Sequence, residues 1–169
     1  RPHFSMFWQS QVPRLTLLDE RGRSTSLTLV AGALEGARAP APPPDSWAAQ
    51  ADADIAIWSL AMQPNARFEL PRTAPGTDRT LYVFGGGGVR VGEANARPVT
   101  ALRLRRGAPV LLENGAHPSE LLLLQGRPIG EPVVKHGPFV MNHRAEIEQA
   151  IRDYRRTQFG GWPWQGGGP

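Results

Sequence analysis

Apolar and polar residues alternate in short runs along most of the chain, and turn residues separate the runs. Arg14–Leu18 and Thr25–Val30 flank a turn-rich stretch, Asp19–Arg23, so these two runs predict a β-hairpin. The run Asp54–Met62 has few polar residues, which predicts a strand that is buried on both faces. Further strand-like runs bring the candidates to about eight to ten: 67–70, 80–84, 99–104, 109–112 and 120–124.

One segment has helical periodicity instead. Within Arg144–Arg156, apolar side chains recur at the spacing i, i+3, i+4 and i+7 and so fall on one helix face: Ile147, Ala150, Ile151 and Tyr154. Asn142 or His143 is expected to cap the start of this helix, and Gly160 and Gly161 to end it. The spacing of Glu148 and Arg152 predicts an ion pair on its surface.

Glycine and proline mark the bends between the strands. The four glycines Gly85–Gly88 lie between two strand-like runs, with no Gly-Lys-Ser/Thr sequence after them, so they predict a tight bend and not a phosphate-binding loop. The proline-rich stretch 39–44 predicts a stiff surface loop; a ligand for a proline-binding domain is the alternative. Many short strands, glycine bends and one closing helix together predict an all-β barrel or jelly roll.

Composition limits the classes of protein that remain. The 169 residues suit one domain with a tail, and the absence of cysteine excludes disulfides, thiolate metal sites and a cysteine nucleophile. A chain without disulfides fits a reducing compartment, so a cytoplasmic location is expected. No apolar run reaches the ~18 residues that a membrane span needs.

The chain has a formal charge of +4, and all but one of its 19 basic residues are arginines. Arg103, Arg105 and Arg106 form the tightest cluster, which as a phosphate-binding stripe would indicate a nucleic-acid partner. Aromatic residues do not alternate with these arginines, so we favour a solvent-exposed strand face and expect no nucleic-acid binding. Near the N-terminus, Phe4, Met6, Phe7 and Trp8 form an apolar cluster that we expect to pack on the barrel or on a segment upstream.

The closing segment carries a family resemblance. Gly130–Asn142, GEPVVKHGPFVMN, followed by Glu146–Gly160, EIEQAIRDYRRTQFG, closely resembles the end of bacterial pirin-like proteins of the cupin superfamily. Three upstream stretches are similar to the start of the second pirin barrel: Arg1–Pro13, Leu27–Gly36 and Asp54–Pro71. The resemblance implies a lead-in segment (1–13), a C-terminal cupin-like domain (14–160) with a closing helix (144–156), and a tail (161–169).

In this family two cupin barrels follow one another, and the first holds the metal. Cupin sites take two histidines one residue apart on a strand, a nearby carboxylate and a later histidine. The corresponding stretch here, 68–82, has no histidine and carries Leu70 and Arg72 where donors would be expected. The resemblance therefore implies a chain with no metal, cofactor or catalytic site of its own, and Fe in an N-terminal barrel that this sequence does not contain.

Two weaker site hypotheses involve the remaining histidines. Glu113 and His117 are close enough in sequence to share a metal, although a turn would leave them exposed. Glu131 and His136 could form a proton-transfer pair; the alternative, which we favour, is that Glu131 accepts backbone N–H groups in a turn while His136 fills a loop. No Ser/His/Asp arrangement or G-x-S-x-G sequence is present.

The function implied by the resemblance is structural support of the N-terminal barrel, which would be this chain's partner. The intact protein would be a quercetin 2,3-dioxygenase-type enzyme with Fe, or a redox-sensitive regulator that binds other proteins, while this chain alone would not be an enzyme. The alternative is a free-standing module that binds a protein partner, associates with itself or binds a small molecule. A protein partner would dock on the aromatic residues near the two ends, Phe4, Phe7, Trp8, Trp162 and Trp164.

Overall fold

The computed structural model describes residues 5–158, which form two compact units divided at Pro128 and Ile129. In the described part of the first unit, fourteen short elements follow one another: η1 (Gln9–Gln11), β1 (Arg14–Leu18), β2 (Ser24–Ala31), β3 (Ala33–Leu34), β4 (Ala37–Arg38), η2 (Trp47–Ala49), η3 (Ala51–Ala53), β5 (Ala56–Met62), β6 (Arg67–Leu70), β7 (Asp78–Gly86), β8 (Val89–Val91), β9 (Ala94–Ala96), β10 (Thr100–Arg103) and β11 (Val110–Asn114), before β12 (Ser119–Gly126). The described second unit holds β13 (Val134–His136), β14 (Phe139–Met141) and α1 (Arg144–Thr157).

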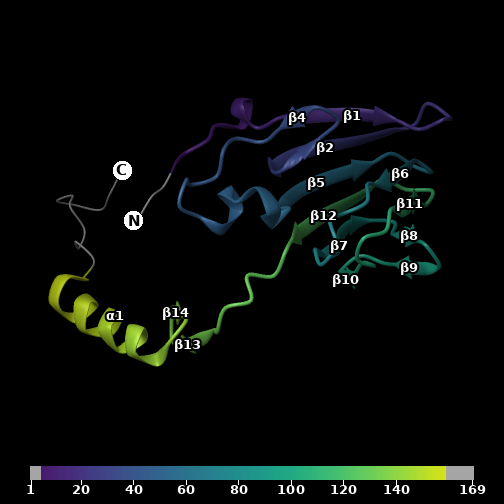
Figure 1. Ribbon diagram of the computed structural model, residues 1–169. Coiled ribbons are helices and arrows are strands. Elements are labelled where there is room, and N and C mark those ends of the chain that lie inside the picture. Colours follow the sequence, from purple (N-terminus) through teal and green to yellow (C-terminus); the bar gives the residue numbers. More distant parts are fainter. Residues whose placement is uncertain (1–4, 159–169) are drawn as a thin grey trace, which may run out of the picture. The chain divides into compact units, whose positions relative to one another are not determined.

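The first unit contains two facing antiparallel sheets (Figure 1). One has six strands in the order β1-β2-β5-β12-β7-β10, and the other has four in the order β6-β11-β8-β9. The strands β5 to β12 pair in a nested manner: β5 with β12, β6 with β11, β7 with β10 and β8 with β9. This nesting is that of a long hairpin folded over on itself, which is a jelly roll, so the predicted fold class is confirmed.

The core lies between the two sheets because strand alternation sends every second side chain inward. Leu60, Leu81 and Leu121 from the larger sheet and Leu70 and Leu112 from the smaller one are all at most 1% exposed. In β5 the inward side chains are buried while most outward ones are half-buried. The prediction that this strand is buried on both faces was therefore wrong, because its outward side chains are half-buried or exposed.

The predicted hairpin and glycine bend are both present. Asp19 accepts hydrogen bonds from the backbone of Arg21 and Arg23, each at 2.9 Å, which closes the turn between β1 and β2. At the glycine bend, Gly86 has φ +90°, and a Cβ built on it would lie 1.9 Å from the carbonyl oxygen of Pro118. Only glycine fits there, because the chain both takes a left-handed turn and lies against the neighbouring strand. Sequence periodicity had missed the hairpins β3–β4 and β13–β14 and the strand β9, all of which have strands of three residues or fewer.

The second unit consists of the β13–β14 hairpin and α1, which contact each other. The helix begins after His143, whose backbone N–H donates to Glu146 Oε2 at 2.7 Å, and ends at Thr157 with Gln158 in the left-handed region. Gly160 and Gly161, expected to end it, lie outside the described residues. The predicted Glu148–Arg152 pair is replaced by Arg144–Glu148, with 3.6 Å between nitrogen and oxygen.

Within residues 5–158, no helix is both long and apolar enough to cross a bilayer.

Candidate functional site

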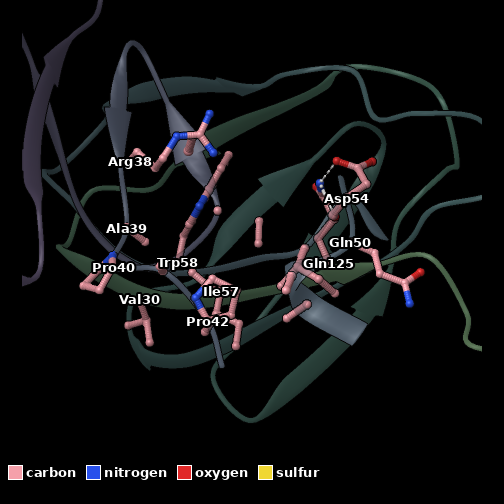
Figure 2. A pocket seen from close by; sticks show the side chains of 18 of the residues that line it. Val30, Arg38, Ala39, Pro40, Pro42, Gln50, Asp54, Ile57, Trp58 and Gln125 are labelled. Carbon is pink, nitrogen blue, oxygen red and sulfur yellow. Dashed lines mark hydrogen bonds between the residues drawn. The ribbon is translucent and has the colours of Figure 1, made fainter. Parts of the chain in front are cut away.

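A cavity of about 730 Å³ lies at one end of the jelly roll in the first unit. The end of β2, the start of β5 and the end of β12 meet there, since Ala56 pairs with Gln125 in the sheet. The segment 38–51, which contains the proline-rich loop, forms the opposite wall. Figure 2 shows the wall residues Arg38, Ala39 and Pro40 together with Trp58 of β5. The predicted stiff loop is therefore one wall of this cavity.

Asp54 organises the side of the cavity next to β12. Its Oδ2 accepts the backbone N–H of Ala74 at 3.0 Å and the hydroxyl of Thr77 at 2.7 Å. Its Oδ1 accepts Gln125 Nε2 at 3.0 Å, which is the dashed line in Figure 2. Asp54 has φ +49°, a left-handed conformation that aspartate tolerates better than most residues. One side chain thus joins the β5 start, the β6–β7 loop and β12.

The 3₁₀ turns that carry the cavity wall are held by Arg127, the residue after β12. The indole Nε1 of Trp47 donates to the carbonyl oxygen of Arg127 at 3.2 Å, and the Arg127 guanidinium lies 4.9 Å from the centre of the Trp47 ring. Arg127 also pairs with Asp52 at 2.6 Å between Nη2 and Oδ2. These contacts are all within the first unit, so its cavity wall has its own anchor.

Beside the cavity, Arg79 is 1% exposed and bridges two loops. It donates to the carbonyl oxygen of Pro71 at 2.7 Å and to that of Ala108 at 2.5 Å. Desolvation by burial lowers the pKa of Arg79, while the nearby charge of Asp54 opposes that change. A guanidinium stays charged even so. Arg79 is therefore a buried cation that holds the two loops together at this end of the barrel.

The two positions where metal donors would be expected, Leu70 and Arg72, lie in different surroundings. Leu70 is fully buried in the core and Arg72 is exposed at the cavity wall. Across residues 5–158, no three histidine, cysteine, aspartate or glutamate side chains lie close enough together to hold a metal ion. The donor set of a cupin iron site therefore does not fit the residues present.

The two weaker pairs also find other partners. Glu113 forms ion pairs with Arg67, at 2.8 Å, and with Arg90 across the four-stranded sheet, so its carboxylate is already used. Glu131 accepts a hydrogen bond from Asn142 Nδ2 at 2.5 Å, and not the backbone N–H groups we expected. His136 lies opposite Phe139 in the β13–β14 hairpin, so it is part of a strand and not of the loop we expected.

Two of the three arginines of the cluster pair with one carboxylate. Asp78 Oδ1 lies 3.0 Å from Arg103 and 2.6 Å from Arg106, and all three side chains are partly exposed. Hydrogen bonds from Arg106 and then Arg103 lower the pKa of Asp78 to about 2. Leu104 is buried while Arg103 and Arg105 are exposed, as the predicted strand alternation requires. The interpretation of the arginines as a solvent-exposed strand face is therefore supported. Their partner Asp78 could not be found from sequence spacing.

The described residues of the N-terminal apolar cluster are largely exposed, contrary to the alternative that they pack on the barrel. Met6 and Trp8 are 69% and 70% exposed, and Phe7 is 45% exposed at the rim of the cavity. Phe4, Trp162 and Trp164, which completed the hypothetical docking surface, lie outside the described residues.

Comparison with known proteins shows which family this chain resembles. The family model "Pirin C-terminal cupin domain" matches residues 57–160. A Vibrio cholerae protein with the name "Putative quercetin 2,3-dioxygenase" is 40% identical over 113 residues, which are 67% of this chain and 34% of that protein. A Pseudomonas aeruginosa protein of the same name is 28% identical over 94% of this chain and 51% of its own length. The chain thus spans between a third and about half of these relatives.

A solved structure agrees with the sequence comparisons. The crystal structure of quercetin 2,3-dioxygenase from Acinetobacter baumannii at 1.88 Å matches 89% of this chain and 48% of its own, with a TM-score of 0.72 and 28% identity. The family-model match covers more than half of the 169 residues and includes most of the jelly roll and the closing helix. This chain belongs to the pirin family of the cupin superfamily and has the fold of that family's C-terminal cupin domain.

Proposed function

We propose that this chain is the metal-free half of a two-barrel protein and supports an N-terminal barrel that holds Fe. The intact protein would then be an oxidoreductase of the quercetin 2,3-dioxygenase type, or a redox-sensitive regulator. The lengths of the relatives support a second barrel, since this chain spans 34% and 51% of the two described above. The donor set supports the metal-free role, because the core position Leu70 is apolar where a ligand would be needed.

The observation that carries the proposal is the outer face of the six-stranded sheet. Outward side chains on β12 and β7 make it apolar: Leu124 is 37% exposed, Tyr82 38% and Phe84 52%. Leu122 lies opposite Tyr82 and Leu124 opposite Ile57, so these side chains are neighbours on one surface. An exposed apolar surface of this kind marks an interaction site, and we assign the N-terminal barrel to it.

The second unit supports the same assignment. Among its described residues only Ile147 is buried, whereas Val133, Val140 and Tyr154 are 66%, 56% and 49% exposed. A hairpin and one helix of this size cannot form a core of their own. We propose that this unit, too, is completed by the N-terminal barrel.

The first test is the coding sequence upstream of Arg1 together with a metal measurement. We expect the upstream sequence to encode a barrel with an H-x-H strand, and the 169-residue chain to hold no stoichiometric Fe, Mn, Zn, Ni or Cu after incubation with each ion and desalting. A tight equivalent of one metal per chain would overturn the metal-free role, and an upstream stop codon would overturn the two-barrel protein.

The second test addresses the docking surface. The upstream barrel is produced as a separate polypeptide, and its binding to this chain is measured by titration calorimetry. Leu124→Lys and Phe84→Lys should each weaken binding at least ~10-fold, because a lysine cannot be desolvated cheaply at an apolar contact. Ser26→Lys, an exposed position on β2 of the same sheet outside the apolar surface, is the matched control and should bind like the wild type. Equal effects of all three substitutions would refute the assignment.

A further inference from the structure

The cavity at the end of the jelly roll has a lining that sets the class of ligand it can hold. Its walls are mainly the methyl groups and rings of small rigid residues, among them Ala39, Pro40, Pro42, Ala49 and Ala56. Such side chains lose little or no rotamer freedom when a ligand covers them. Its volume of about 730 Å³ falls in the usual range of small-molecule sites. The walls therefore favour a compact apolar body.

The lining of the cavity has more positive than negative groups, and the two kinds differ in whether they are already hydrogen-bonded. Arg38 and Arg72 supply two positive charges and Asp54 one negative charge, so the lining carries a net charge of +1. The Asp54 carboxylate already accepts three hydrogen bonds. Arg38 and Arg72 have no hydrogen bond or ion pair among the described residues that would occupy their guanidinium groups. The available charge in the cavity is therefore positive.

Trp58 adds an aromatic wall and a donor. It is 3% exposed, and within the described part of the chain its indole Nε1 has no hydrogen-bond partner. The half-buried indole of Trp47 at the same end donates its Nε1–H to a carbonyl oxygen. A buried N–H without an acceptor is unfavourable, so an acceptor brought in by a ligand would be stabilising. Figure 2 shows Trp58 among the lining side chains, between the Arg38 side and the Gln125 side.

From these three features we propose that the cavity binds a small organic carboxylate with a flat apolar body. The ring system would lie against Trp58 and the alanine and proline wall, and the carboxylate would accept hydrogen bonds from Arg38 and Arg72, which bind carboxylates well because the guanidinium donors form a planar fork. This site lies at the end of the jelly roll and shares Ile57 with the edge of the apolar outer sheet face, but the inference does not depend on the proposed two-barrel function.

The test uses 2-naphthoate as the probe and 2-naphthalenemethanol as its neutral counterpart, with binding to the 169-residue chain measured by titration calorimetry. We expect naphthoate to bind once per chain and the alcohol to bind at least ~10-fold more weakly, since charge-assisted hydrogen bonds are the stronger ones. Arg38→Ala and Arg72→Ala should each weaken naphthoate about 10-fold and leave the alcohol unchanged. Arg97→Ala, an exposed arginine outside the cavity, is the control and should change neither.

A cavity-filling variant separates this site from other apolar surfaces. Ala49→Phe places a ring at the cavity wall and should abolish binding of both probes, while far-ultraviolet circular dichroism and the unfolding midpoint confirm that the variant is folded. Phe84→Lys, on the outer sheet face at the end of β7 that is remote from the cavity, should leave naphthoate binding intact. Equal binding of the two probes, insensitivity to both arginine substitutions, or unchanged binding to folded Ala49→Phe would each overturn the proposal.

Discussion

Replacement of Asp54 should destabilise the first unit by an amount that its hydrogen bonds define. The carboxylate accepts hydrogen bonds from Ala74 N–H, the Thr77 hydroxyl and the Gln125 amide. Thr77 is 1% exposed and Gln125 is half-buried, so two of these donors would lose a partner with little access to water. At about 1 kcal/mol for each of three bonds, Asp54→Ala loses about 3 kcal/mol. The left-handed backbone adds about 1 kcal/mol for alanine, giving about 4 kcal/mol.

Two further variants separate the side chain from the backbone. Asp54→Gly removes the same hydrogen bonds but accepts φ +49° without strain, so it should be about 1 kcal/mol more stable than Asp54→Ala. Asp54→Asn keeps an acceptor for Gln125 and tolerates the left-handed conformation, so it should lose only about 1–2 kcal/mol. This ordering, Asn above Gly above Ala, follows directly from the two effects.

The assay is equilibrium urea unfolding followed by tryptophan fluorescence and circular dichroism, with slopes checked for a two-state transition. Glu35→Ala provides the matched control, since Glu35 is also a non-glycine residue at positive φ but is exposed and has no hydrogen bond among those of the described residues. Because glutamate already bears the left-handed cost that alanine would bear, Glu35→Ala should lose close to nothing. If Asp54→Ala loses no more than Glu35→Ala, the Asp54 hydrogen bonds do not hold this end of the barrel together and the reasoning fails.

Two other predictions follow from the glycine bend and the exposed ion pairs. Gly86→Ala should lose at least ~3 kcal/mol or fail to fold, because the added Cβ would lie 1.9 Å from the Pro118 carbonyl oxygen, whereas Gly22→Ala, with φ +71° but open space around it, should lose only about 1 kcal/mol in the same urea assay. Comparable losses would show that conformation alone governs both sites. The pKa of Asp78 is lowered from 3.8 to about 2 by Arg106 and Arg103, so its ionised form stabilises the folded state above about pH 4, and that contribution is lost as the pH falls toward 2. Wild type should therefore exceed Asp78→Asn in stability at pH 6 and converge with it near pH 2, as measured by thermal unfolding across this range; a constant difference would contradict the assignment.

The strands and the helix were predictable because their signals are local. Period-two alternation gave β1 and β6 at their observed bounds, and the i, i+3, i+4, i+7 pattern gave a helix that ends one residue later than expected. The Gly85–Gly88 bend was predictable for the same reason, since glycine accepts the positive φ that a tight bend between strands needs. The family resemblance rested on a similarly continuous segment, the last motif and the helix after it.

The candidate site was not predictable, because its parts are far apart in the sequence. Asp54 meets Ala74, Thr77 and Gln125 only when the jelly roll closes, and Trp47 reaches Arg127 across 80 residues. Periodicity indicates on which face of a strand or helix a side chain lies, but not which distant loop it contacts. The proline-rich stretch shows the difference: its composition indicated a stiff loop, while its place as the wall of a cavity depends on how β2, β5 and β12 end together.

The sequence by itself thus determined the elements, the jelly-roll class and the family, because these depend on neighbouring residues and on the alternation between buried and exposed faces. Tertiary structure alone decided which polar groups are paired. It placed Glu113 with two arginines, Asp78 with two others and Asp54 with three donors. It left the guanidinium groups of Arg38 and Arg72 and the indole N–H of Trp58 without a hydrogen-bond partner among the described residues. The physical reason is that hydrogen bonds act over about 3 Å, a proximity that only the closed barrel creates between residues distant in the chain.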